Sequence, residues 1–189
     1  MPVRVVVADD EPLIRMGVRC ILEDAGHVVV AECGSSDEVV DAVRRHAPDV
    51  VLLDIRMPGQ GGLEVARQLA AEHPVPIVFL TAYGDRTLVL EAAQAGGYGY
   101  ILKPVNERQL LAALELAAAR WQDVQGLKDA LETRKLVERA KGILMQRLGL
   151  SEEDAYELLR RRSRNSRRPL RDVARDVLTA NEAFRQPRR

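Results

Sequence analysis

The chain has 189 residues, of which 47% are hydrophobic and 30% charged, enough apolar content for one or two domains with a packed core. No apolar run approaches the roughly 18 residues of a membrane span, and Arg4 and the acidic residues 9–11 interrupt the only candidate for a signal peptide. The formal charge is zero, yet residues 1–125 carry a net charge of −7 and residues 126–189 a net charge of +7. This division predicts two modules with different partners.

Short apolar segments alternate with amphipathic helical patterns through the first two thirds of the chain. Strands are expected at 3–8, 28–32, 50–53, 77–80 and 100–102, and helices at 13–25, 37–46, 62–72 and 86–95. Ser36 is the expected N-cap of the second helix. Strands that alternate with helices in this way predict an α/β fold, a doubly wound (βα)5 parallel sheet.

A long helix is expected to follow, over residues 106–148, opened by a capping pair of Asn106 and Gln109. Its apolar residues step by four and three, as in a coiled-coil seam. The seam comprises Leu110, Leu114, Ala117, Trp121 and Val124, and continues to Leu131 after a register shift near Gly126.

The last third predicts a small all-α domain. Gly149 should end the long helix, Ser151 should cap a helix that ends at about residue 162, and Pro169 should start a last helix that ends at about residue 180. Residues 186–189 are expected to be a disordered tail.

Polar side chains follow four of the expected strands. Asp9 and Asp10 follow the first strand, and Asp54, Thr81 and Lys103 follow the third, fourth and fifth. Carboxyl ends of parallel strands share one edge of a sheet, so these groups should surround one pocket. Clustered carboxylates suit Mg²⁺, and a carboxylate beside Mg²⁺ and a lysine suits phosphoryl transfer. Helix capping explains a single aspartate at a strand end but not the whole set.

Residues 3–120 resemble the receiver domain of two-component response regulators, through Asp9-Asp10, the Leu-Leu-Asp-Ile-Arg-Met-Pro-Gly run around Asp54, Thr81-Ala82 and the segment 100–104. The resemblance implies phosphorylation of Asp54 by a sensor histidine kinase, a flavodoxin-like fold and a cis Lys103–Pro104 bond. It also implies specific roles: Mg²⁺ bound by Asp9, Asp10, Asp54 and the Arg56 carbonyl, phosphoryl contacts from Thr81 and Lys103, and switching by Tyr100. The alternative for Tyr100 is an ordinary half-buried strand residue.

The second module is basic, with seven arginines in the twelve residues 160–171. Such a run is often only a solvated helix face, but arginine forks also suit phosphate oxygens and give salt-dependent binding to nucleic acids. Gly142 lies within the long helix, where glycine is unfavourable, so a close contact is expected at its missing side chain.

Residues 131–180 resemble the ANTAR domain, a three-helix RNA-binding output module of bacterial antiterminators. Three segments carry the resemblance: 132–145, with its Ala-Lys-Gly run, 151–160, and 167–174. The resemblance implies binding of structured RNA hairpins. The expected RNA-contacting residues are Arg139, Lys141, Tyr156, Arg160, Arg161 and Arg167, although Tyr156 could instead serve helix packing.

These patterns together predict a receiver (residues 1–120), a coiled-coil-like helical linker (121–130), an ANTAR domain (131–182) and a tail (183–189). The expected function is phosphorylation-dependent transcription antitermination, with homodimerisation along the seam and no independent enzymatic turnover. The runner-up is a DNA-binding response regulator, disfavoured because the connection over residues 162–169 exceeds the usual 3–4-residue helix-turn-helix turn. A scaffold protein whose tail only dimerises is the third hypothesis. The cysteines, Cys20 and Cys33, lack metal-binding spacing, which favours a reduced, cytoplasmic protein.

Overall fold

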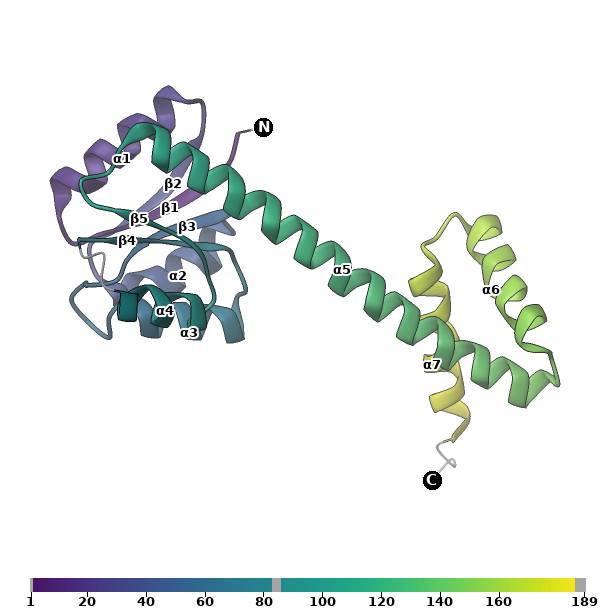
Figure 1. Ribbon diagram of the computed structural model, residues 1–189. Helices are drawn as coiled ribbons and strands as arrows, with labels where there is room; N and C mark the ends of the chain where they lie inside the picture. The colour runs from purple at the N-terminus through teal and green to yellow at the C-terminus, as the bar shows by residue number, and fades with distance from the viewer. Residues whose placement is uncertain (1, 83–85, 186–189) are drawn as a thin grey trace. The chain divides into compact units, whose positions relative to one another are not determined.

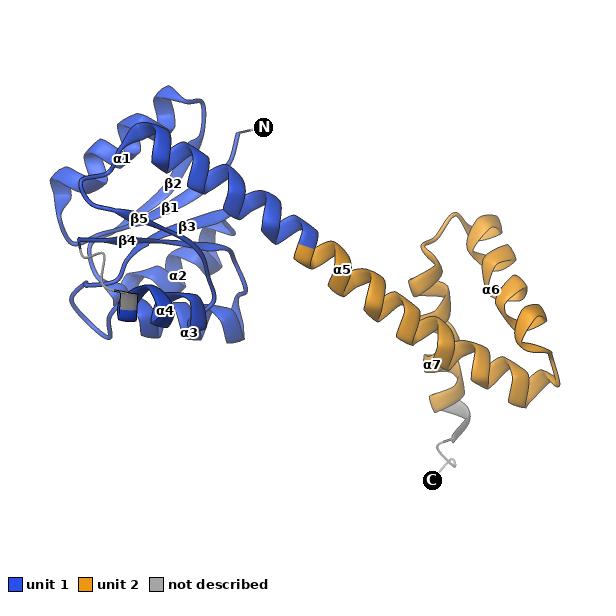
Figure 2. Ribbon diagram, viewed as in Figure 1, with its two compact units in different colours: residues 1–123 blue, residues 124–189 orange. Residues whose placement is uncertain are grey.

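The computed structural model describes residues 2–82 and 86–185 (Figure 1). It divides into two compact units, Met1–Asp123 and Val124–Arg189 (Figure 2). Each unit has its own hydrophobic core.

The first unit is a five-stranded parallel sheet with the strand order β2-β1-β3-β4-β5. Its strands are β1 (Arg4–Ala8), β2 (Val28–Cys33), β3 (Val50–Asp54), β4 (Ile77–Thr81) and β5 (Gly97–Leu102). Its helices are α1 (Pro12–Asp24), α2 (Ser36–His46), α3 (Gly62–Glu72), α4 (Arg86–Gln94) and the start of α5 (Glu107–Leu148). The predicted (βα)5 fold is confirmed.

Helices cover both faces of the sheet. The helices α1 and α5 lie on one face, and α2, α3 and α4 lie on the other (Figure 1). Every residue of β3 and β4 is buried, which is why these strands read as continuous apolar runs in the sequence.

The last strand begins three residues earlier than expected, at Gly97. The start of this strand was not predicted because it contains Gly97 and Gly99, and glycine has little intrinsic preference for extended structure. The missing side chain has a packing role, since a Cβ on Gly97 would lie 2.8 Å from both the Phe79 ring and the Ala92 carbonyl oxygen.

The expected N-cap of α2 is wrong by one residue. Ser35 occupies the cap position, whereas Ser36 is buried and begins the helix. The Ser36 hydroxyl donates to the Pro58 carbonyl at 2.9 Å and accepts from the Gly61 amide at 3.2 Å. It therefore fastens α2 to the loop that follows the third strand.

The helix α5 extends from Glu107 to Leu148, as predicted, and the Asn106 side chain accepts from the Gln109 amide at 3.3 Å. However, Leu110, Leu114 and Ala117 are fully buried in the receiver core. The interpretation of these positions as a seam for a second chain is therefore wrong. Their spacing is that of an amphipathic helix packed on its own sheet.

The second unit comprises the end of α5, α6 (Glu152–Ser166) and α7 (Leu170–Arg185). Its core consists of Val137, Ala140, Leu159, Val173 and Ala174. The predicted stop at Gly149 is confirmed by its left-handed φ of 66°, and the Ser151 cap by its bond from the Asp154 amide. Residues 186–189, the expected tail, lie outside the described residues.

The predicted end of the helix that follows Ser151, at about residue 162, is wrong. The helix α6 continues to Ser166, where Arg167 adopts the left-handed conformation with a φ of 53°. The connection to α7 therefore comprises only residues 167–169, so its length is no argument against a helix-turn-helix.

The expected contact at Gly142 is also wrong. Gly142 is exposed, and a Cβ built there would meet nothing within 4 Å. Neither the core nor helix packing in this unit requires glycine at this position.

Candidate functional site

The first candidate site is an acidic pocket at the carboxyl edge of the sheet. Asp9 directly follows β1, Asp54 and Thr81 are the last residues of β3 and β4, and Lys103 directly follows β5. The register of parallel strands brings these positions together, since Asp54 pairs with Leu80 and Thr81 with Leu102. The predicted Lys103–Pro104 cis bond is confirmed.

Lys103 is the electrostatic centre of the pocket. Its Nζ lies 2.6 Å from Asp54 Oδ2, 2.7 Å from Asp9 Oδ2 and 3.2 Å from Glu11 Oε1. Asp9 is fully buried, Asp54 is 5% exposed and the Lys103 side chain is 9% exposed. Glu11 is a contact that sequence reasoning missed, although it directly follows the Asp9-Asp10 pair.

Burial and pairing act in opposite directions on the ionisation of this pocket. Burial raises the pKa of Asp9, and its pairing with Lys103 only partly offsets this. Burial also disfavours the charged form of Lys103, but its bonds to Asp54 and Asp9 outweigh that effect and raise the lysine pKa above its ordinary value. Lys103 is therefore a fixed cation at neutral pH.

The pocket has the donor set of a hard divalent cation. One carboxylate oxygen from each of Asp9, Asp10 and Asp54 lies within 4.8 Å of the others. Asp9 Oδ2 is buried and pairs with the Lys103 ammonium at 2.7 Å. Backbone amides hold the carboxylates of Asp9 and Asp54 in place: Asp9 Oδ1 accepts from the Glu11 amide, and Asp54 Oδ1 accepts from the Arg56 amide. Three oriented carboxylates so close together fit Mg²⁺.

Two further predicted residues lie on neighbouring strands, Thr81 at the end of β4 and Tyr100 within β5. Thr81 is 3% exposed, and its carbonyl accepts from the Lys103 amide at 2.8 Å. Tyr100 is 49% exposed on β5, so its ring lies at the surface.

The second candidate site is the arginine-rich surface of the second unit. Acidic residues pair with part of it. Glu157 contacts Arg160 and Arg164 at 2.9 and 3.5 Å, and Asp176 binds Arg168 through two bonds of 2.7 and 3.3 Å.

Other basic side chains on this surface have no carboxylate partner among the described residues. They are Arg139, Arg161, Arg162 and Arg167. No ion pair to a described carboxylate neutralises Arg139, Arg161 or Arg167, so these three are the strongest phosphate-binding candidates. Arg162 lies close enough to Asp176 to contribute, after Arg168, to the lowered pKa of that carboxyl. It was not among the residues predicted from the sequence.

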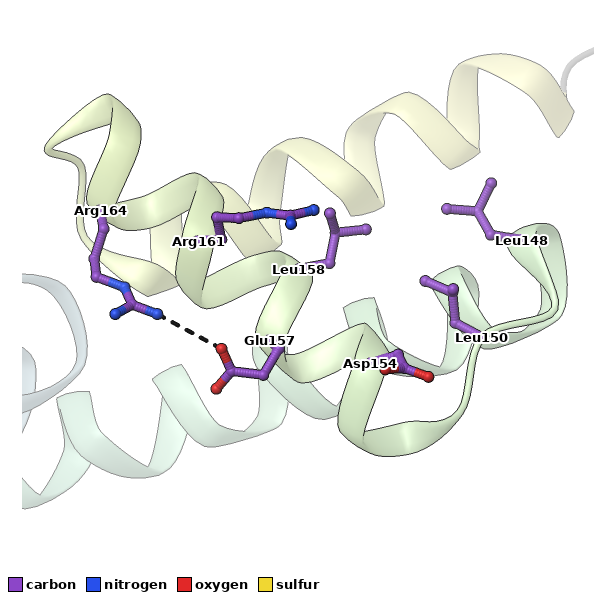
Figure 3. Close-up of a pocket in the computed structure, with 7 residues that line it drawn as sticks. All are labelled: Leu148, Leu150, Asp154, Glu157, Leu158, Arg161 and Arg164. Carbon is purple, nitrogen blue, oxygen red and sulfur yellow. Dashed lines mark ion pairs between the residues drawn. The ribbon is translucent and has the colours of Figure 1, made fainter.

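A groove runs beside Arg161 on α6. Figure 3 shows the Arg164–Glu157 ion pair at one end of it and Leu148 and Leu150 at the other. Leu158 contributes a further apolar side chain to its lining. Its lining thus combines three leucines with two guanidinium groups and two carboxylates.

Lys141 and Tyr156, also predicted as RNA contacts, have contrasting surroundings. Lys141 is only 7% exposed, and its ammonium donates to Glu138 at 2.9 Å and Glu152 at 2.7 Å. These bonds raise its pKa. Tyr156 is 40% exposed, and the Arg160 guanidinium carbon lies 5.9 Å from its ring centroid.

Two family models match the chain, and each covers one of the two candidate sites. The response regulator receiver domain model matches residues 5–115, and the ANTAR domain model matches residues 125–178. The chain therefore belongs to the response regulators and joins a receiver domain to an ANTAR domain.

The relatives are transcriptional regulators. The chain is 39% identical over 185 residues to the transcriptional regulatory protein PdtaR of Mycobacterium tuberculosis, covering 94% of this chain and 90% of PdtaR. It is 36% identical over 139 residues to BtsR of Escherichia coli K12, covering 71% of this chain and 57% of BtsR. These matches point to a regulatory family rather than an enzyme family.

Solved structures resemble the first unit. The signal receiver domain of NarL from Mycobacterium tuberculosis matches with a TM-score of 0.60 and 37% identity, covering 62% of this chain and 97% of that domain. Among the described helices, none is long and apolar enough to cross a membrane.

Proposed function

We propose that this response regulator is a cytoplasmic protein that a sensor histidine kinase phosphorylates on Asp54, and that phosphorylation controls its binding to structured RNA and hence transcription antitermination. The observation that carries the proposal is the pairing of a phospho-acceptor geometry with an RNA-binding family. Asp54 lies 2.6 Å from Lys103 and within a three-carboxylate cluster, and residues 125–178 match the ANTAR domain.

Asp9, Asp10 and Asp54 would hold Mg²⁺, together with the Arg56 carbonyl oxygen. When bound, Mg²⁺ neutralises charge on the incoming phosphoryl group. The Asp54 carboxylate is the nucleophile: its oxygen would form a bond to phosphorus as the P–N bond of the kinase's phosphohistidine breaks and the imidazole leaves. The Arg56 amide holds Oδ1, and Oδ2 is the oxygen that Lys103 holds at 2.6 Å before transfer. Lys103 would give up its contact with Asp54 Oδ2 and donate instead to an oxygen of the transferred phosphoryl group.

A phosphoryl group adds about −1.5 to −2 charges to a pocket whose carboxylates pair with Lys103. Thr81 is at the end of the strand beside β5, so a shift of its hydroxyl toward the phosphoryl group vacates space behind it. We infer that Tyr100, now at the surface, rotates inward to fill that space. The changed surface of β5 and α5 would favour homodimerisation.

The output is RNA binding by the second unit. Arg139, Arg161 and Arg167 would contact phosphates, with Arg160 beside Tyr156, and Lys141 would act at the edge of this surface. Two such units, brought together in a dimer, would bind paired hairpins and prevent a terminator from forming.

The test is a filter-binding titration of RNA hairpins against the full chain, with and without a small-molecule phosphodonor and Mg²⁺. Phosphorylation should tighten binding, and Asp54→Ala should abolish the change without abolishing folding. Equal binding by the phosphorylated protein and Asp54→Ala would contradict phosphorylation control, and absence of binding to any hairpin would contradict the RNA output.

A DNA-binding output is the second candidate. The observation in its favour is the short connection of residues 167–169 between α6 and α7, which matches a helix-turn-helix turn. Competition of duplex DNA against hairpin RNA at one salt concentration separates the two. DNA that displaces RNA at equal or lower concentration would favour this candidate.

A further inference from the structure

Glu11 lies beside the acidic pocket, and helix capping does not explain its side chain. It occupies the N-cap position of α1, but its carboxylate makes no cap bond. Its backbone is fixed on both sides, because its amide donates to Asp9 Oδ1 at 2.9 Å and its carbonyl accepts from the Ile14 and Arg15 amides at 3.1 Å. Pro12, the first residue of α1, restricts the Glu11 backbone further. A rigid backbone therefore presents this carboxylate to another partner.

That partner is Lys103. Glu11 Oε1 lies 3.2 Å from the Lys103 ammonium, which also contacts Asp54 Oδ2 at 2.6 Å. Since both oxygens contact one nitrogen, they can be no more than about 6 Å apart. The Glu11 side chain is 61% exposed, whereas the side chains of Asp9 and Asp54 are 0% and 7% exposed. Of the three carboxylates that pair with Lys103, that of Glu11 therefore lies on the solvent side.

The charge of Glu11 is additional to the three carboxylates that fit Mg²⁺. With Mg²⁺ held by Asp9, Asp10 and Asp54, the Lys103 ammonium would bring the pocket to neutrality, and the Glu11 carboxylate leaves it with one net negative charge. A phosphodonor that diffuses freely must bring its own negative charges close to this carboxylate in order to reach Asp54. Repulsion between like charges opposes that approach, and salt screens the repulsion because Glu11 is exposed.

We propose that Glu11 is a specificity-determining residue for phosphorylation of Asp54, an inference that rests on the proposed function. Its carboxylate selects against small, free, highly charged phosphodonors and so reserves Asp54 for a phosphohistidine that a protein partner holds against the pocket. In such a complex, contacts between the two protein surfaces offset the local repulsion. A free phosphodonor makes no such contacts.

The test compares two small phosphodonors of different charge on the full chain with Mg²⁺. Acetyl phosphate is a dianion near neutral pH, and phosphoramidate is a monoanion. With either donor an Asp54 oxygen forms a bond to phosphorus, while the P–O bond breaks and acetate leaves in the first case, and the P–N bond breaks and ammonia leaves in the second. Intact-protein mass spectrometry measures the rate of phosphorylation.

Glu11→Gln should raise the rate with acetyl phosphate about three- to tenfold at low salt, and should raise the rate with phosphoramidate by less. Both gains should shrink to less than about twofold near 1 M salt, where the screening length is only about 3 Å. A side chain with a merely structural role would not produce a gain that depends on the charge of the donor.

Two matched variants separate the charge from other effects of substitution. Glu11→Asp keeps the charge beside the pocket and should retain the slow rate of the parent chain. Glu23→Gln removes the same charge near the other end of α1, where Glu23 pairs with Arg19 at 3.6 Å, and should leave the rate within about twofold of the parent value. In calorimetry, the Mg²⁺ affinity of Glu11→Gln should stay within about threefold of the parent value, since the cluster that fits Mg²⁺ comprises Asp9, Asp10 and Asp54.

Equal gains for the two donors, gains that persist at high salt, or a slower rate in Glu11→Gln would overturn this inference and leave the proposed phosphorylation of Asp54 intact. An equal gain in Glu23→Gln would do the same. If neither donor phosphorylates the parent chain or Glu11→Gln, the inference and the proposed function both fall.

Discussion

Replacing Leu114 by alanine tests whether the first part of α5 belongs to the receiver core or to a surface for a second chain. Leu114 is 0% exposed and packs within the cluster on the α1 side of the sheet. A Leu→Ala change at such a site costs about 2–5 kcal/mol through lost burial and the cavity it leaves. Leu127, on the same helix, is 72% exposed, so Leu127→Ala should change the free energy of unfolding by less than about 0.5 kcal/mol.

Urea unfolding followed by Trp121 fluorescence measures this difference in the first unit. Trp121 is the only tryptophan, and its ring packs edge-on against Tyr98 with centroids 5.5 Å apart. With a urea m-value of about 1–3 kcal/mol/M, a loss of 3 kcal/mol lowers the midpoint by roughly 1–3 M. The core placement would be refuted by a Leu114→Ala midpoint no lower than that of Leu127→Ala, combined with a loss of dimer in sedimentation experiments.

Three other predictions concern the acidic pocket, a buried core thiol and the arginine-rich surface. Lys103→Met should bind Mg²⁺ about tenfold more tightly in calorimetry, because no ammonium competes for the carboxylates, yet accept phosphate more slowly from a small phosphodonor; unchanged Mg²⁺ affinity would contradict this. Burial raises the pKa of Cys33 to about 11, so near pH ~8 iodoacetamide should label exposed Cys20 and spare Cys33. The pKa of the Cys33 thiol in the folded chain exceeds its ordinary value of about 9. Its contribution to the free energy of unfolding is therefore fully present below pH about 9 and is lost as the pH rises through about 11. Arg161→Ala should reduce the salt slope of RNA binding by about 0.7–0.9, whereas Arg168→Ala, whose guanidinium is already bound by Asp176, should leave it nearly unchanged.

Local sequence patterns predicted the acidic pocket well because parallel topology makes it a consequence of strand order. Once β1, β3 and β4 are placed side by side, Asp9, which follows β1, must lie at the same edge of the sheet as Asp54 and Thr81, which end β3 and β4. Glu11 was missed because its role depends on where the Lys103 side chain reaches, which no spacing in the sequence encodes.

The basic unit was harder to predict, because a count of arginines does not say which of them are neutralised. Arg168 and Arg161 look alike in the sequence, yet only the folded chain brings Asp176 to Arg168. Likewise, Lys141 looked like a surface cation, and the packing of α6 against α5 placed it between two carboxylates.

The sequence by itself determined the two-module division, the doubly wound sheet, the long helix and the carboxylates of the acidic pocket, since hydrophobic periodicity and strand-end residues are local signals. The tertiary structure alone decided how the apolar spacing of α5 is used. Leu110 and Leu114 step as they would in a coiled coil, and only their burial against the sheet shows that they serve the receiver core. The physical reason is that helix periodicity specifies which residues share a face, whereas the partner of that face is a long-range contact.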